Sequence, residues 1–382
     1  MITTPDKRFE DIRPYNDSEI PAAMQRLAAN PLLDQVSAWL FPDRSTEEFR
    51  NMLRSVRTNS QLQERVMYPV FKSVIEKTTS GLTFHGNPER DPDKGALYIS
   101  NHRDIVLDAT LQQLIIYENN IIPAEISFGS NLMEYPLLLD LGKSNKMFKV
   151  FRKSDNMRQL VKNSRHLSDY MRDRISRGIS LWIAQHDGRS KDGNDITDPG
   201  LLKMLTLSGG NDTIQSLSFM NIIPVAISYE IEPCDILKVK ETWRNKTEGT
   251  FSKNPGEDLV SIVTGITQYK GRVHITFCPP VTEQDLVPYT LFPCSEFLKK
   301  VAALIDQRIY DGYKLYGINY AAYDLITGRK EYQEYYTAED QKLLEQRELL
   351  LPHDNEDVLV SMTDMLRHIY ANPVINKIKY GS

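Results

Sequence analysis

A histidine and two aspartates stand close together where a short apolar run, ALYIS, gives way to the segment NHRDIVLDA. The imidazole of His102 can accept a proton near neutral pH, and the carboxylate of Asp104 or Asp108 could fix its tautomer and stabilise its charged form. A pair of this kind can activate a hydroxyl group for attack on an acyl carbon. The simpler alternative is that Asn101 and Asp104 cap the following helix and that His102 takes no part in chemistry.

Basic side chains follow two other apolar runs in the same way. The run FKVF is followed by Arg152 and Lys153, and the run ISLWIA is followed by QHDGRSK, which contains Arg189 and Lys191. Because the carboxyl ends of parallel strands meet at one edge of a sheet, these four side chains are expected to converge near His102. Guanidinium groups hold a phosphate through paired hydrogen bonds, lysine adds charge, and helix N-termini attract the anion further. Any one of the four bases alone could be a solvated surface residue, so the predicted anion site depends on the whole set.

The elements that must position these residues are short strands alternating with helices. The candidate strands between residues 82 and 280 are LTFHG, ALYIS, AEISFG, FKVFR, ISLWIAQ, IIPVAIS and RVHITF. Between the fourth and fifth runs, apolar residues from Met157 to Ile175 recur at helical spacing, which predicts an amphipathic helix that ends at Gly178. This alternation predicts an α/β fold with a largely parallel central sheet flanked by helices.

The chain is expected to divide into three parts. Residues 1–80 are predicted to form a helical N-terminal domain, in which Ser45 and Glu48 make a capping box. Residues 81–315 would form the α/β domain, closed by a helix near residues 295–313. Residues 316–382 would form a helical C-terminal extension, interrupted at Pro352 and Pro373. A length of 382 residues exceeds one typical core and agrees with more than one packed unit.

Composition restricts the class of protein. A net charge of -5 argues against general nucleic-acid binding. No apolar run reaches the ~18 residues that span a membrane, and the N-terminal segment MITTPDKRFEDIRPYND lacks an apolar signal region, so we expect a cytoplasmic protein. Three separate cysteines suit a reducing compartment. The sequence contains no HExxH motif and no clustered His/Cys set, so we expect no metal and no cofactor.

In order and spacing, four blocks of the sequence resemble the glycerolipid acyltransferase family. The blocks are NHRDIVLD, FKVFRK, HDGRSK and IIPVAI, beside the family's NHx4D motif, its strand ending in Arg, its EGTRS-like or GGR-like loop and its (V/I)PVxI strand. The resemblance covers roughly residues 80 to 280. It implies an O-acyltransferase of phospholipid biosynthesis that moves a fatty acyl chain from an acyl-carrier-protein or CoA thioester to glycerol-3-phosphate or 1-acyl-glycerol-3-phosphate.

The resemblance also implies a role for each block. His102 would be the general base and Asp108 would orient it. The substrate-binding residues would be Asn101 at the start of the first motif, Arg152 and Lys153 in the second, Asp187, Gly188, Arg189 and Lys191 in the third, and Pro224 in the fourth.

The sequence departs from the family pattern in two places. The family spacing is H-x4-D, whereas five residues separate His102 from Asp108. Either a turn before the helix absorbs the extra residue or Asp104 takes the place of Asp108, and we favour Asp108. The third motif usually carries Glu, whereas this chain has Asp187 preceded by His186.

Two other functions would use the same residues. In an acyl thioesterase, water would replace the acceptor hydroxyl, and no cluster of bases would be needed. In a non-catalytic lipid- or acyl-carrier-binding protein, the fold would persist without the chemistry. The segment 145–191 carries twelve Lys or Arg against four Asp, so it is a candidate face for an acidic carrier protein or, by peripheral contact, for a membrane.

Overall fold

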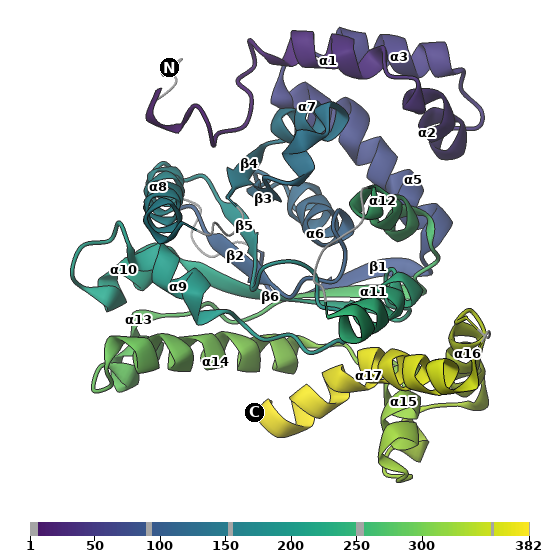
Figure 1. The fold of residues 1–382 in the computed structure, drawn as a ribbon. Helices are drawn as coiled ribbons and strands as arrows, with labels where there is room; N and C mark the ends of the chain where they lie inside the picture. Colours follow the sequence, from purple (N-terminus) through teal and green to yellow (C-terminus); the bar gives the residue numbers. More distant parts are fainter. Residues whose placement is uncertain (1–6, 89–93, 152–155, 250–255, 353–354, 382) are drawn as a thin grey trace.

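The computed structural model describes residues 7–88, 94–151, 156–249, 256–352 and 355–381, and its strands form one seven-stranded sheet (Figure 1). The order across the sheet is β1-β7-β6-β2-β5-β3-β4. Neighbouring strands are parallel except for β6 and β7, which are antiparallel. All of them fall on the predicted apolar runs, and the predicted α/β fold class is confirmed. The strands are β1 (Gly81–His85), β2 (Leu97–Ser100), β3 (Glu125–Gly129), β4 (Met147–Val150), β5 (Leu181–Ala184), β6 (Ile222–Tyr229) and β7 (Arg272–Phe277).

Two apolar layers follow from the alternation of side chains along the central strands. Leu97 and Ile99 of β2 belong to one layer and Tyr98 to the other, since successive residues of a strand face opposite sides of the sheet. Helices α8, α9, α10 and α14 contribute to the first layer, and α5 and α6 contribute to the second. Because both faces are covered, every residue of β2 and β6 is buried, which accounts for their continuous apolar sequences.

The helices between the strands include the predicted amphipathic helix, α8. Its second half, from Leu167 to Ile175, buries the predicted apolar face. Met157 and Val161, in the first two turns, are 69% and 48% exposed, and Leu160 and Ser164 from the same part of the helix line an open pocket. The elements are α6 (Leu107–Glu118), η3 (Leu132–Glu134), α7 (Pro136–Ser144), α8 (Met157–Ser176), α9 (Pro199–Thr206), α10 (Thr213–Phe219), α11 (Asp235–Glu248), α12 (Glu257–Thr267), α13 (Glu283–Leu286), η4 (Val287–Tyr289) and α14 (Cys294–Gly312).

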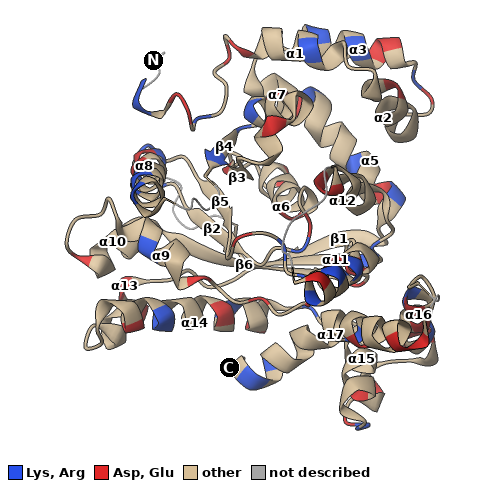
Figure 2. Ribbon diagram, in the orientation of Figure 1, with Lys and Arg blue, Asp and Glu red and all other residues tan. Residues whose placement is uncertain are grey.

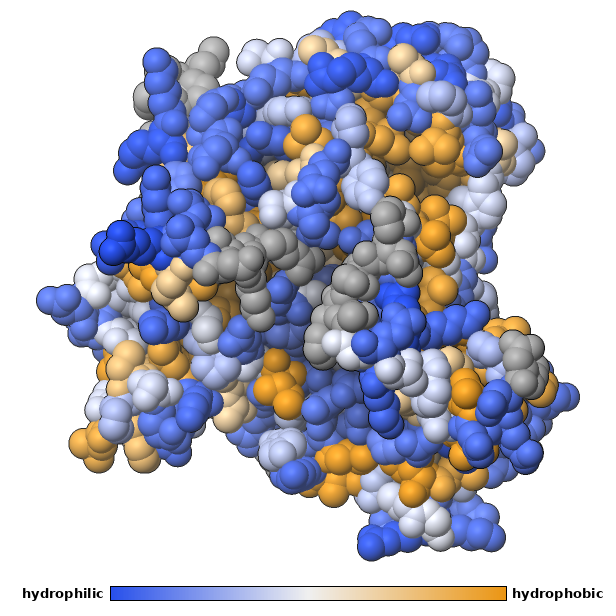
Figure 3. Space-filling view, viewed as in Figure 1, coloured by the Kyte–Doolittle hydropathy of each residue, from blue (hydrophilic) through white to orange (hydrophobic). Residues whose placement is uncertain are grey.

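The N-terminal helices form an apolar cluster of their own, together with Leu137 and Leu141 of α7. The predicted capping box of Ser45 and Glu48 is present at the start of α3. Figure 3 shows a mostly hydrophilic surface over α1, α3 and α8, with hydrophobic residues exposed toward α2 and α5. The elements are η1 (Lys7–Phe9), α1 (Ile20–Ala28), α2 (Leu32–Leu40), α3 (Thr46–Ser55), α4 (Asn59–Leu62), η2 (Gln63–Met67) and α5 (Tyr68–Thr78).

The C-terminal helices lie side by side at one end of the molecule, where they also contact α11. Pro373 was expected to interrupt the tail but lies inside α17, so that expectation is wrong. None of the described helices combines the length and apolar character that crossing a bilayer requires. The division of the chain into three domains stays a prediction. The elements are α15 (Gly317–Thr327), η5 (Gln333–Tyr335), α16 (Ala338–Glu348) and α17 (Glu356–Tyr380).

Candidate active site

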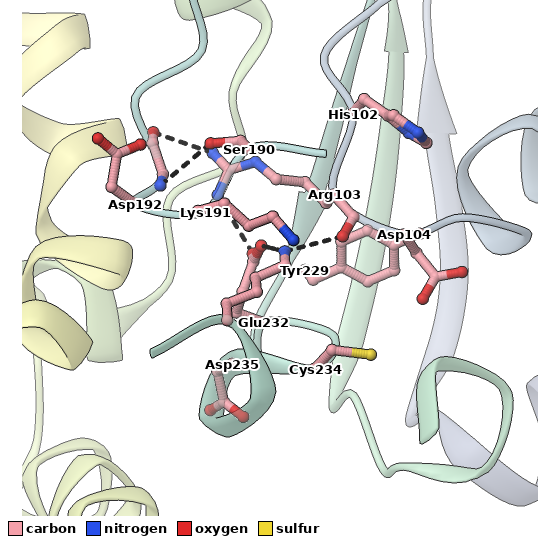
Figure 4. A network of polar contacts seen from close by, with 12 residues as sticks. His102, Arg103, Asp104, Ser190, Lys191, Asp192, Tyr229, Glu232, Cys234 and Asp235 are labelled. Atoms are coloured by element: carbon pink, nitrogen blue, oxygen red, sulfur yellow. Dashed lines mark hydrogen bonds and ion pairs between the residues drawn. The ribbon is translucent and has the colours of Figure 1, made fainter. Parts of the chain in front are cut away.

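His102 lies in the loop between β2 and α6, and its ring points away from the ionic network around Arg103 (Figure 4). Its Nδ1 is 2.9 Å from Oδ2 of Asp108 in the first turn of α6. The ring meets Trp182 edge to face, with centroids 5.8 Å apart. Because an ionised carboxylate can only accept, the proton of neutral His102 lies on Nδ1. Nε2 is therefore the nitrogen that can take a proton from a substrate.

The carboxylate of Asp108 is fully buried and receives hydrogen bonds on both oxygens. Oδ2 also accepts from the amides of Arg103 and Asp104, at 2.6 and 2.8 Å. Oδ1 accepts from the hydroxyl of Tyr229 at 2.8 Å. Burial and the charge of Asp108 raise the pKa of Tyr229 well above its usual value, so the phenol remains a donor. These donors compensate the buried charge and fix the orientation of the carboxylate toward His102.

The extra residue in the first motif is absorbed by a turn built on Asp104. Its Oδ1 accepts from the amides of Val106 and Leu107, both at 2.8 Å. Its Oδ2 is buried and has no hydrogen-bond partner among the described residues. Burial, with repulsion from Asp108, raises the pKa of Asp104. The structure therefore brings Asp108, and not Asp104, to His102.

A pocket of about 280 Å³ opens at the carboxyl ends of β2 to β5, and His102 forms part of its wall. Five further ionisable residues on this wall are His186, Asp187, Arg189, Asp198 and Asp258. Burial lowers the pKa of His186, which favours its neutral form. A wall of this composition suits a long apolar ligand with one polar end. Its apolar residues include Ile105, Phe128, Leu132, Val150, Phe151, Leu160, Leu167, Ile183, Leu201 and Met204.

Arg189 brings a positive charge to this pocket. The residue is only 7% exposed, and its Nη1 has no hydrogen-bond partner among the described residues. Its loop is held beside His102, because the amide of Ser190 donates to the carbonyl of His102 at 2.8 Å. A buried guanidinium nitrogen without a partner is costly. In the structure this charge acts on the buried carboxyl of Asp104, where it opposes the rise in that group's pKa.

The other residues of the third motif are placed differently. Asp187 and Gly188 line the pocket, and Gly188 has a φ of 77°, a conformation that favours glycine. Lys191 does not line it, and its ammonium group forms an ion pair with Glu241 of α11. The structure thus brings Arg189, but not Lys191, to the pocket of His102.

Asn101 and Pro224 are buried in the sheet. The amide oxygen of Asn101 accepts from the backbone N of Ile227 at 2.8 Å, and its amide nitrogen donates to the carbonyl of Ile227 at 2.9 Å. Asn101 therefore joins the end of β2 to β6. Pro224 lies in β6, where it is paired with Ile99 of β2, and it does not line the pocket. Arg152 and Lys153 lie outside the described residues.

Sequence reasoning missed Tyr229 and Arg103. Tyr229 is the last residue of the IIPVAISY strand, where a polar group at the carboxyl edge could have drawn attention. The guanidinium of Arg103 is buried and donates to Asp195 at 2.6 Å. Its neighbour in the sequence is His102, but no local pattern distinguishes it from a solvated arginine.

A scan against models of known protein families finds no match. The chain is 24% identical over 191 residues to the glycerol-3-phosphate acyltransferase of Histophilus somni (strain 129Pt), a match that covers 49% of this chain and 22% of that protein. It is 25% identical over 196 residues to the glycerol-3-phosphate acyltransferase of Actinobacillus succinogenes, covering 49% of this chain and 21% of that protein. The match thus spans about a fifth of the length of these curated relatives.

Among solved structures, the chain is similar to the crystal structure of the 1-acyl-sn-glycerophosphate acyltransferase PlsC from Thermotoga maritima. The TM-score is 0.34 and the sequence identity is 13%. The alignment covers 75% of this chain and 97% of that chain.

Proposed function

We propose that this protein is an O-acyltransferase that moves a fatty acyl chain from a thioester to a hydroxyl group of glycerol-3-phosphate or its 1-acyl form. One observation carries the proposal: His102, paired with Asp108 at 2.9 Å, lies on the wall of a largely apolar pocket that Arg189 also lines. The similarity to two proteins named glycerol-3-phosphate acyltransferase supports it.

In the proposed reaction, His102 Nε2 removes the proton of the acceptor hydroxyl as its oxygen attacks the thioester carbonyl carbon. The resulting imidazolium is stabilised by Asp108, whose carboxylate already accepts from Nδ1. The tetrahedral intermediate collapses with cleavage of the carbon–sulfur bond, and His102 returns the proton to the departing thiolate. Neither a metal nor a covalent acyl-enzyme is required for these steps.

The acceptor's phosphate would bind at Arg189, with Asp187 and Gly188 shaping the loop around it. Lys191 could join only by leaving its ion pair with Glu241. Asn101 and Pro224 would act indirectly, by holding β2 and β6 in place. Arg152 and Lys153, which lie outside the described residues, complete the proposed phosphate site by resemblance alone.

The donor would be an acyl-carrier-protein or CoA thioester, and the lipid product implies peripheral contact with the cytosolic face of a membrane. Helix α8 borders the pocket through Leu160, and Figure 2 shows its concentration of basic residues. Arg158, Lys162 and Arg165 on this helix could attract either an acidic carrier or anionic lipid head groups.

A free-thiol release assay tests the proposal. The full chain would receive palmitoyl-CoA or the palmitoyl carrier protein, with glycerol-3-phosphate, 1-acyl-glycerol-3-phosphate or no acceptor. We expect acceptor-dependent release that His102→Ala reduces by about 10²- to 10⁴-fold. The matched control is His368→Ala, since His368 is a histidine of α17 that lies outside the pocket and whose side chain is 41% exposed.

The alternatives give other results in the same assay. Release that depends on His102 but not on an acceptor would identify a thioesterase. No release with any pair of substrates, or equal release from wild type and His102→Ala, would contradict the proposed transferase and favour a binding protein.

A further inference from the structure

A buried ionic network holds Arg103, the residue that follows the candidate base (Figure 4). Its guanidinium donates to Asp195 at 2.6 Å and to Glu232 at 3.2 Å. Lys238, which is fully buried, donates to the carbonyl oxygen of Arg103 at 2.8 Å and to Glu232 at 2.5 Å. The amide of Arg103 is at the same time a donor to Asp108. The position of this amide therefore depends on the partners of the Arg103 side chain and carbonyl.

The C-terminal helices fix one of those partners. The hydroxyl of Tyr370 in α17 donates to Asp235 at 2.7 Å and accepts from the backbone N of Glu232 at 3.3 Å. Arg347 in α16 binds both carboxylate oxygens of Asp235, at 2.6 and 2.9 Å. The short segment 232–235, which presents Glu232 to Arg103, is thus held from the side of the C-terminal extension.

Helix α17 also contacts the loop at residues 192–195, which supplies Gly193 and Asp195 as acceptors for Arg103. The carbonyl of Gly193 accepts from Arg103 at 3.3 Å, and a Cβ at Gly193 would stand only 2.3 Å from the carbonyl oxygen of Ile369. Pro373 lacks the N–H that would bond the carbonyl of Ile369 within the helix. This carbonyl therefore faces the loop. Asn372 donates to the carbonyl of Asp192 at 2.8 Å. The backbone of α17 therefore packs directly on residues 192–193.

We propose that the C-terminal helices position the catalytic loop, with Tyr370 and Arg103 as positioning residues. Neither side chain lines the pocket of His102, so neither touches substrate. Tyr370 holds segment 232–235, and Arg103 transmits that constraint to the amides that orient Asp108 toward His102. The catalytic part of this inference rests on the proposed acyl transfer, whereas its structural part does not.

The test compares Tyr370→Phe with Tyr336→Phe in the full chain. Both tyrosines lie in the C-terminal region and donate a hydroxyl to an aspartate, but Tyr336 bonds Asp324 and does not contact the network. We expect Tyr370→Phe to lower kcat by about 10- to 100-fold, because small displacements of a catalytic group cost that much, with KM for donor and acceptor unchanged. Tyr336→Phe should retain wild-type kcat.

Amide hydrogen exchange at residues 103 and 104 supplies a readout that needs no activity. We expect faster exchange in Tyr370→Phe and wild-type exchange in Tyr336→Phe, with both variants folded by circular dichroism. If wild type shows no acceptor-dependent thiol release, the proposed function fails, while the exchange result still decides the positioning inference. Wild-type exchange in Tyr370→Phe would overturn it, as would unchanged kcat in an active enzyme.

Arg103→Lys is a second variant at the centre of the network. Lysine keeps the charge but lacks the planar group whose separate nitrogens donate to Asp195, Glu232 and Gly193. We expect it to increase exchange at residues 103 and 104 more than Tyr370→Phe does. Exchange at the wild-type rate in a folded Arg103→Lys protein would also contradict the inference, and if this variant does not fold, Tyr370→Phe alone decides.

Discussion

Two carboxylates four residues apart receive opposite treatment from their surroundings. Asp108 is buried among donors that favour its charge, including the hydroxyl of Tyr229 and the ring of His102. Asp104 is equally buried, but one of its oxygens has no partner among the described residues, and its pKa is raised. The environment, rather than the residue type, therefore makes Asp108 the partner that can stabilise an imidazolium.

Exchange of each carboxylate for an amide should separate these roles. We expect Asp108→Asn to lower kcat/KM for acyl transfer by about 10²- to 10⁴-fold, since the amide removes the charge and can stabilise the wrong tautomer of His102. Asp104→Asn keeps the oxygen that caps α6 and should retain most of the activity. Steady-state kinetics of both variants check this. A greater loss in Asp104→Asn would return Asp104 to the role of partner.

Arg189 should control acceptor binding rather than chemistry. Replacement by Gln removes a charge-assisted interaction with phosphate of about 1.5 to 3 kcal/mol, so KM for glycerol-3-phosphate should rise about 10- to 100-fold. Initial rates at varied acceptor concentration measure this effect. Arg329→Gln, at an exposed arginine of the C-terminal region, serves as the control. An unchanged acceptor KM in Arg189→Gln would place the phosphate elsewhere.

At this scale the sequence was informative where a motif is local. His102, Asp108 and Arg189 could be selected from strand ends and spacing. The burial of Arg103 could not, because its partners Asp195 and Glu232 are 92 and 129 residues away in the chain. The ion pair of Lys191 with Glu241 is likewise a contact between distant segments, and it removes from the pocket a base that the motif predicted to lie there.

At the scale of elements, apolar periodicity located the strands and α8. It did not predict how much of the apolar face of α8 is covered by other elements. The exposed Met157 and Val161 continue the apolar spacing of the buried residues in α8, so spacing alone could not distinguish them. Pro373 was a comparable case. Its place inside α17 depends on a neighbour, Gly193, that leaves room for the carbonyl of Ile369.

Helix α14 gives a prediction about stability and pH. Asp306 of this helix accepts from the amide and hydroxyl of Thr197, at 2.8 and 2.5 Å. Burial raises its pKa from 3.8 to about 7. Between these values the folded chain holds a proton that the unfolded chain has released, so this contribution to stability is lost as pH rises through about 7.

Asp306→Asn keeps the accepting oxygen and removes the ionisation. We expect the free energy of unfolding of wild type to fall relative to the variant with rising pH, by at most about 1.4 kcal/mol per pH unit. Urea unfolding of both proteins at pH values from about 5 to 8 measures the difference. A constant difference across that range would show that Asp306 does not titrate there.

For the whole molecule, the cysteines differ in reactivity. Cys234 and Cys278 are buried, and burial raises their pKa values to about 11 and about 12, whereas Cys294 is exposed. Since the thiolate is the reactive species, a thiol reagent should titrate one group in the native protein and three after unfolding. Rapid modification of more than one thiol in the native protein would contradict this structure. The number of thiols that react in the native protein also sets the background of the thiol release assay.

The order of strands across the molecule could not be predicted from the sequence. Individual runs indicate strands, but the antiparallel register of β6 with β7 depends on pairs such as Val225 with Phe277, which no local pattern encodes. The parallel pairing of β1 with β7 joins Gly81 to Arg272. These two residues are farther apart in the sequence than Val225 and Phe277.

That last pairing has a consequence for synthesis. The edge strand β1 leaves the ribosome long before β7 exists, because the residues from 82 to 271 must be made in between. At usual elongation rates of about 5 to 20 residues per second, the nascent chain carries an unpaired β1 for roughly ten to forty seconds. During that interval the strand can pair with other chains, so yield in rapid expression should be limited by this interval rather than by the stability of the finished fold.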